Sequence, residues 1–108
     1  MVGISASVRK IEFLYSAECP SHPEALALLR DVLEARSVEA TVEVREVRTD
    51  EEARRLSFPG SPTIRVNGTD VDASGADGRP TLSCRVYRLA DGRFSPVPAR
   101  AQLERALA

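Results

Sequence analysis

Apolar residues recur along the chain with two spacings, and each spacing predicts a different kind of element. Alternation at every second position predicts four strands, over 9–15, 40–48, 63–67 and 82–87. Apolar residues at helical spacing predict three helices, over 25–36, 50–56 and 99–107. The order β-α-β-α-β-β-α predicts an α/β fold with a four-stranded mixed sheet flanked by helices. A strand–helix–strand unit favours parallel pairing, whereas strands adjacent in sequence favour an antiparallel hairpin.

Local signals indicate where these elements begin and end. Two segments, Ser21–Glu24 and Thr49–Glu52, have the spacing of a capping box, so each is expected to open a helix. The Asn67–Gly68 pair predicts a tight turn after the third strand. Residues 69–81 are rich in Gly, Asp and Ala and are expected to form a mobile connection. Without repeats or linkers, residues 1–108 are expected to form one domain, with 1–8 as an N-terminal extension.

Composition and charge exclude several classes of protein. A chain of 108 residues with 43% hydrophobic and 29% charged residues is typical of one globular domain. Fifteen basic and sixteen acidic residues give a net charge of −1, which does not favour nucleic-acid binding. No apolar run approaches the roughly eighteen residues of a membrane span. The start lacks the pattern of a secretory signal, so we expect a cytoplasmic protein without a membrane partner.

The two cysteines and the single histidine are the candidate chemical groups. Two cysteines are too few for a disulfide scaffold, and a cytoplasmic setting favours free thiols. Cys19 lies just before the first predicted helix, where unpaired amide groups and the helix dipole favour the thiolate. Cys19 is therefore expected to be reactive, and the alternative is an unreactive cysteine in a loop.

Two short motifs lie at matching joints of the predicted fold. Cys19-Pro20-Ser21-His22 stands between the first strand and the first helix, and Ser61-Pro62-Thr63 stands immediately before the third strand. This combination resembles the thioredoxin superfamily, including glutaredoxin-like proteins, and is similar to small bacterial thioredoxin-like proteins of unassigned function. In that superfamily a cysteine of a Cys-x-x-Cys motif begins the first helix and faces a cis proline.

The resemblance implies a thioredoxin-like fold from about residue 9 to the end of the chain. It also implies a cis Ser61–Pro62 bond and a catalytic Cys19. The residues around both motifs would bind an extended thiol partner: Pro20, Ser21, Ser61, Pro62 and Thr63. His22 stands where the superfamily has its second cysteine, so no disulfide can form within the motif. His22 could assist Cys19, or it could point into water.

Cys84 has two interpretations. It shares the apolar phase of Leu82 and Val86, so it could pack in the core. It could instead act as a resolving thiol for Cys19. If the fourth strand is antiparallel to the third and ends near Arg88, Cys84 lies roughly 13 Å from the active end. A disulfide needs Cα atoms within about 7 Å, and a shift of register by two residues would halve the gap.

These observations favour thiol–disulfide exchange or thiol trapping through Cys19, with a thiol or disulfide as partner and no cofactor. One alternative is a binding module that kept the fold and lost the dithiol. Another is a protein that handles soft metals or organomercurials with Cys19 and Cys84. The spacing does not match a closed zinc site, so we expect no metal site. Three acidic residues on the predicted connection are expected to be solvated: Asp70, Asp72 and Asp77.

Overall fold

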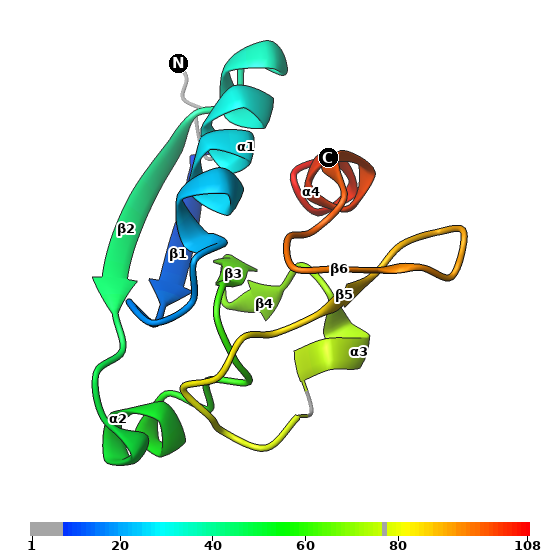
Figure 1. Cartoon of the computed structure of the whole chain (residues 1–108). Helices are drawn as coiled ribbons and strands as arrows, with labels where there is room; N and C mark the ends of the chain where they lie inside the picture. Colours follow the sequence, from blue (N-terminus) through cyan, green and yellow to red (C-terminus); the bar gives the residue numbers. More distant parts are fainter. Residues whose placement is uncertain (1–7, 77) are drawn as a thin grey trace.

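The computed structural model describes residues 8–76 and 78–108, which contain a four-stranded mixed sheet (Figure 1). The strands, in the spatial order β2-β1-β3-β4, are β2 (Ala40–Glu46), β1 (Arg9–Tyr15), β3 (Thr63–Val66) and β4 (Thr69–Asp70). β1 pairs in parallel with β2 and antiparallel with β3, and β3 pairs antiparallel with β4. The prediction of an α/β fold with a mixed sheet is therefore confirmed.

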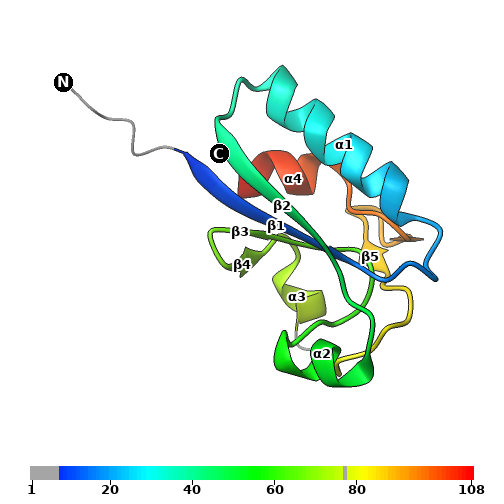
Figure 2. The ribbon, with the colours of Figure 1, turned by 90° about the vertical axis from the view of Figure 1, so that its left-hand side faces the viewer.

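Helices cover both faces of the sheet (Figure 2). The two longest, α1 (His22–Ala35) and α4 (Arg100–Ala106), lie on one side, and α2 (Asp50–Arg55) and the single turn α3 (Ala73–Ala76) lie on the other. Within the described part of the chain, no helix is both long enough and apolar enough to span a bilayer.

The alternation in β1 divides the core between these two faces. Ile11 and Phe13 point into the larger cluster, where the apolar stripes of α1 and α4 pack. Leu14 points to the opposite face and packs with Val47 and Phe58 beneath α2. Since β1 is central and buried on both faces, it holds the loop that follows it in a fixed place.

The fourth strand of the sheet is not the one that the alternation predicts. The turn at Asn67–Gly68 has positive φ at both residues, as expected for a tight hairpin, and it returns the chain at once as β4. β4 therefore occupies the edge of β3 that residues 82–87 were expected to occupy. The predicted connection 69–81 contains both β4 and α3, while Asp77 and residues 1–7 lie outside the described residues.

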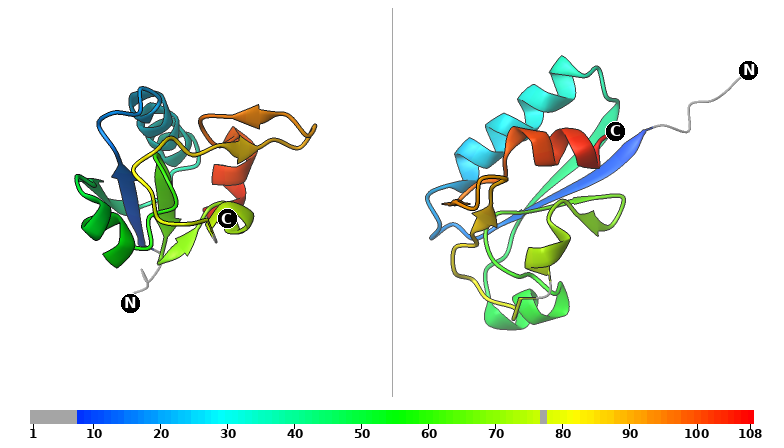
Figure 3. Two further views of the ribbon diagram at one scale, coloured as in Figure 1. Left: turned by 60° about the horizontal axis from the view of Figure 1, so that its bottom comes forward. Right: turned by 90° about the vertical axis from the view of Figure 1, so that its right-hand side faces the viewer.

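Residues 81–86 cross to the other end of β3, where Cys84 forms an isolated parallel bridge with Ser61, just before the strand begins. The chain then forms a separate hairpin of β5 (Tyr87–Arg88) and β6 (Phe94–Ser95), which lies beside α4 (Figure 3). The prediction that residues 82–87 form a strand antiparallel to β3 is therefore wrong.

The side-chain phase of that segment is also the reverse of the prediction. Core packing was one of the two interpretations of Cys84, which shares its apolar phase with Val86, but both residues are exposed, Val86 to 60%. The buried residues are instead Arg85 and Tyr87. This inversion is tolerated because the two Nη atoms of Arg85 and the Tyr87 hydroxyl have hydrogen-bond partners inside the protein, which are described below.

Candidate functional site: two thiols beside a cis proline

Cys19 lies in the loop between β1 and α1 and is almost completely buried, with 1% of its surface exposed. Its backbone N–H donates to the Ser16 carbonyl at 3.1 Å, which tightens the loop. The Ser16 N–H in turn donates to the hydroxyl of Ser61 at 2.9 Å. The loop that carries Cys19 is thereby joined to the start of β3.

The peptide bond between Ser61 and Pro62 is cis, as predicted. The backbone of Ser61 holds the segment that carries the second cysteine. Its N–H donates to the Ser83 carbonyl at 3.0 Å, and its carbonyl accepts from the Arg85 N–H at 2.8 Å. These two hydrogen bonds flank Cys84 and fix it opposite Ser61.

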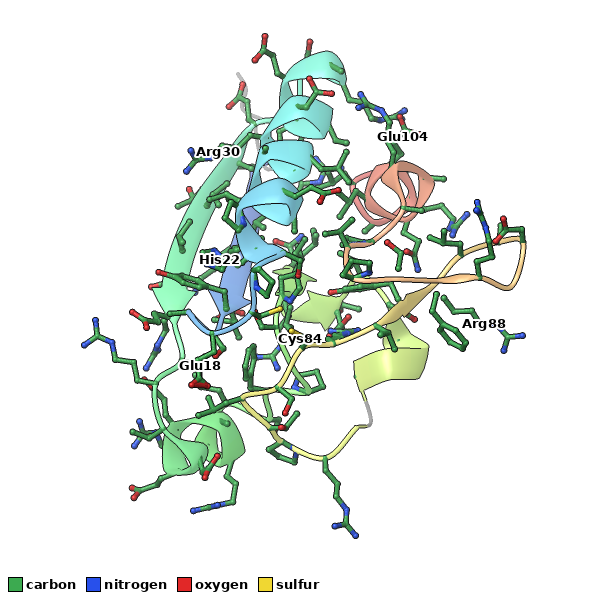
Figure 4. All side chains as sticks on the ribbon, viewed as in Figure 1. Glu18, His22, Arg30, Cys84, Arg88 and Glu104 are labelled. Atoms are coloured by element: carbon green, nitrogen blue, oxygen red, sulfur yellow. The ribbon has the colours of Figure 1, made fainter. Side chains whose placement is uncertain are left out.

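The two cysteines meet at this point, although 65 positions separate them in the sequence (Figure 4). Both are free thiols, and Cys84 Sγ donates to Cys19 Sγ over 2.6 Å. The two sulfurs are therefore close enough to form a disulfide bond. The prediction that Cys84 lies roughly 13 Å from the active end assumed a strand antiparallel to the third strand. That prediction is wrong, because the segment that carries Cys84 runs parallel to the segment at Ser61.

The surroundings of the two sulfurs shift their pKa values in opposite directions. Burial raises the pKa of Cys19, but hydrogen bonds from Cys84 and Ser21 outweigh it, so the pKa lies below the ordinary cysteine value. The pKa of Cys84 is raised, first because its proton is held in the hydrogen bond to Cys19 and then by burial. Of the two sulfurs, Cys19 is therefore the one that ionises at lower pH.

Ser21 does not cap α1 in the way that the capping-box spacing predicts. Its side chain makes no capping hydrogen bond, and its hydroxyl instead lies 3.2 Å from Cys19 Sγ. The second predicted capping box forms only in part: the Glu52 N–H donates to the Thr49 hydroxyl at 3.0 Å, but the Glu52 carboxylate accepts from the Arg48 N–H at 2.9 Å. At the start of α1, the Ser21 hydroxyl therefore contacts the Cys19 sulfur and does not bond the amide groups of the helix.

His22 begins α1 and is half buried, and its ring stacks on Tyr15 with 4.3 Å between ring centroids. Pro20 is exposed beside it. Figure 4 labels His22 together with Cys84 and Glu18. Of these three residues, Cys84 and Glu18 line the cavity beside the sulfurs. The structure thus brings together Cys19, Ser21, Ser61 and Cys84, and it places His22 against an aromatic ring.

A buried ion pair anchors the Cys84 segment, and sequence reasoning missed it. The guanidinium of Arg85 donates to both carboxylate oxygens of Asp70, at 2.9 and 2.8 Å, and the side chains are only 3% and 6% exposed. Arg85 also donates to the Asp72 carbonyl and the Thr63 hydroxyl. A buried fork of this kind fixes geometry strongly, because every lost contact leaves a charge without a partner.

Asp70 was expected to be a solvated loop residue, and that expectation is wrong. Asp70 lies in β4, and its partner is fifteen residues away, so no local pattern could have paired them. The one sequence signal for this ion pair was Arg85 itself, a charged residue that directly follows Cys84 in a segment where apolar and polar residues alternate.

Two further contacts complete the anchor. The guanidinium of Arg85 lies 4.5 Å from the centroid of the Tyr87 ring, in cation–π geometry. The Tyr87 hydroxyl donates to the Pro62 carbonyl at 2.6 Å, which ties β5 to the cis peptide. Two glycines also make room for Arg85. A Cβ on Gly75 would lie 2.8 Å from Arg85 Nη2. A Cβ on Gly60, where φ is +129°, would lie 3.0 Å from Arg85 Cβ.

An open cavity of about 460 Å³ adjoins the two sulfurs. Its charged lining residues are carboxylates, and its walls come from three segments of the chain. The lining residues are Glu18, Cys19, Asp50, Thr81, Leu82, Ser83 and Cys84. A molecule of moderate size could therefore reach the pair from solvent.

The residues that the resemblance assigns to partner binding differ in access. Ser61, Pro62 and Thr63 are buried, and Thr63 donates its hydroxyl to the Gly60 carbonyl at 2.6 Å. The polar groups of Ser61 are used by the chain's own segments, as described above. In this conformation these residues position Cys84.

Among the described residues, no group of three or more His, Cys, Asp or Glu side chains is arranged to hold a metal ion. Comparison with known proteins adds no relative: no protein-family model matches the chain, and no curated protein matches it.

Proposed function

We propose that this chain is a thiol–disulfide exchange protein with a thioredoxin-like fold, and that Cys19 and Cys84 are its redox pair. The observation that carries the proposal is the 2.6 Å separation of the two sulfurs beside a cis proline. A cysteine at the start of α1, a cis proline at the start of β3 and a mixed sheet with helices on both faces support the fold assignment.

The chemistry needs only the two thiols and an external disulfide. One protein sulfur attacks the external disulfide, forming a mixed disulfide and releasing one external thiol. The second protein sulfur then attacks the mixed disulfide and releases the other external thiol. The dithiol becomes a Cys19–Cys84 disulfide while one external disulfide becomes two thiols, and the reverse reaction transfers the electrons back.

The acidity of Cys19 suits it to this reaction. Thiolates rather than thiols react, so a pKa below the ordinary value raises the fraction of reactive sulfur near neutral pH. A raised pKa on Cys84 keeps a proton between the two sulfurs while both are reduced. The alternative of a binding module without a dithiol rested on His22 replacing the second motif cysteine. Cys84 supplies a second thiol from elsewhere in the chain.

The proposal is tested by mild oxidation with diamide, followed by alkylation and peptide mass mapping. We expect the protein to lose two hydrogen atoms, to yield a linked pair of peptides carrying Cys19 and Cys84, and to recover both thiols with dithiothreitol. Cys19→Ser and Cys84→Ser are the matched controls and should form no intramolecular link. Oxidised wild type in which both cysteines are still alkylated would contradict the proposal.

A further inference from the structure

The two cysteines touch through their sulfurs, but they differ in how exposed each residue is. Cys19 is 1% exposed, whereas Cys84 is an exposed residue, and both border the open cavity. Three groups surround the Cys19 sulfur: Cys84 Sγ at 2.6 Å, the Ser21 hydroxyl at 3.2 Å and the Ser61 carbonyl at 3.5 Å. An external sulfur could attack Cys19 only after displacing some of them.

We propose that partner thiols and disulfides exchange at the Cys84 sulfur, and that Cys19 acts from inside as the thiolate that leaves and returns. This inference rests on the proposed function and assigns the two halves of the pair to different steps. It reverses the roles expected from the sequence, in which Cys19 meets the partner and Cys84 resolves.

The reaction balances without any further reactant. In the oxidised protein an external thiolate attacks Cys84 Sγ, the Cys19–Cys84 bond breaks, and Cys19 departs with the bonding electrons as a thiolate. The external sulfur is now bonded to Cys84. Either Cys19 returns and expels it, or a second external thiolate attacks this mixed disulfide and leaves Cys84 reduced, with one external disulfide as product.

The acidities agree with this direction of attack. In thiol–disulfide exchange the sulfur with the lower pKa leaves faster. The hydrogen bonds from Ser21 that lower the pKa of Cys19 do not depend on Cys84, so they favour departure of Cys19 as a thiolate when an external sulfur attacks Cys84. Attack at Cys19 would meet the buried sulfur.

The way in which Cys84 is held also suits a sulfur that meets partners. The two backbone hydrogen bonds to Ser61 flank it, and the buried side chain of the next residue, Arg85, anchors the segment from below. Cys84 is therefore an exposed residue on a fixed backbone, while the side chain of its neighbour Arg85 packs inside the protein. A thiol on a rigid support needs little rearrangement to react.

The test compares how strongly each single thiol discriminates against large reagents. Cys19→Ser leaves Cys84 alone, and Cys84→Ser leaves Cys19 alone. Each variant is reacted with methyl methanethiosulfonate and with a bulky neutral pyridyl disulfide carrying a polyethylene glycol chain. For each variant, the rate with the bulky reagent is divided by the rate with the small reagent, after each rate has been normalised to that of a cysteine-containing peptide. The fraction of thiolate cancels in this quotient, which therefore reports how accessible the sulfur is to large reagents.

We expect the quotient for Cys84 to stay close to that of the peptide, and the quotient for Cys19 to be lower by roughly tenfold or more. Equal quotients, or a higher one for Cys19, would overturn the inference. Cys84→Val fills the space above Cys19 and guards against a path opened by the smaller serine. Circular dichroism of each variant establishes that the fold is retained.

A second measurement uses the wild-type protein and separates this inference from the proposed function. The diamide-oxidised protein is mixed with a thiol that carries a mass tag, quenched in acid at short times and mapped. A tag on Cys84 supports the inference. A tag on Cys19 contradicts it while leaving the redox pair intact, whereas failure to form the disulfide at all would contradict the proposed function itself.

Discussion

Cys19 and Cys84 reach the same point of the molecule by different physical routes. Cys19 is placed by neighbours in sequence, since the end of β1, a tight loop and the start of α1 fix it within a few residues. Cys84 is placed by distant contacts, namely the backbone of Ser61 and the ion pair of Arg85 with Asp70. The comparison teaches that half of a reactive pair can be locally encoded while the other half depends on tertiary structure.

The largest expected effect comes from removing the charge that anchors Cys84. Asp70→Asn leaves the Arg85 guanidinium buried without its carboxylate, which typically costs about 3–5 kcal/mol of unfolding free energy. Urea unfolding measures this loss. We also expect diamide to form the Cys19–Cys84 bond more slowly, because the segment around Cys84 is less firmly held.

The matched control is the double variant Asp70→Asn with Arg85→Met, which removes both charges. It should regain part of the lost stability, since no unpaired charge remains buried. A loss for Asp70→Asn of less than about 1 kcal/mol, which is the range of exposed ion pairs, would show that this pair does not anchor the segment.

A smaller effect is expected at the hydroxyl that ties β5 to the cis peptide. Tyr87→Phe keeps the ring but removes the donor to the Pro62 carbonyl, at a cost of about 1–3 kcal/mol for a buried acceptor without a partner. The pKa of Tyr87 is raised by burial, so this contact should persist at alkaline pH. An unchanged urea midpoint would contradict the assignment.

Much of the Cys19 half of the site could be predicted from sequence. The alternation in β1, the apolar stripe of α1 and the Ser61-Pro62 motif are local patterns, and the first helix and the cis bond were found where expected. One local inference failed. The capping-box spacing assigned Ser21 to the helix end, although its hydroxyl lies beside the cysteine sulfur.

The Cys84 half could not be predicted in the same way. The apolar alternation allowed Cys84 and Val86 to be interpreted as core residues, because it contains no information on the buried partner that Arg85 has in Asp70. The hairpin after Asn67–Gly68 also took the sheet edge assigned to this segment. Long-range pairing of polar groups therefore explains the side-chain phase of the Cys84 segment, and the hairpin explains its path.

The acidity of Cys19 gives a prediction about pH. Because its pKa is lowered and that of Cys84 is raised, alkylation of Cys19 by a small reagent should rise at lower pH than alkylation of Cys84. Ser21→Ala removes one hydrogen bond to the sulfur and should move the Cys19 midpoint to higher pH. Peptide-resolved alkylation rates measured against pH provide both midpoints.

Ser83→Ala is the matched control for that change. The side chain of Ser83 is exposed, and its contribution to the site is the backbone carbonyl that Ser61 bonds. Its midpoint for Cys19 should equal that of the wild type. A Cys19 midpoint at or above that of Cys84 in the wild type would contradict the division of acidities between the two sulfurs.

The smallest effect concerns the carboxylates of the cavity beside Cys84. Glu18 and Asp50 line it, so a cationic disulfide such as cystamine should react faster there than an anionic one such as dithiodipropionate. Replacing them, with Glu18→Gln and Asp50→Asn, should reduce this preference by a few-fold at most, and less at high salt, because exposed charges are screened. A preference that the double variant leaves unchanged would exclude a role for these charges.

The central claim is that Cys19 and Cys84 form one redox unit. The most direct test is a redox titration of the wild-type protein. The protein is equilibrated with graded ratios of reduced and oxidised dithiothreitol and quenched in acid, and its alkylated cysteines are then counted by mass spectrometry. The account predicts a single transition in which both thiols disappear together and the product links Cys19 to Cys84. Persistence of both thiols at every ratio, or separate titration of the two cysteines, would contradict it.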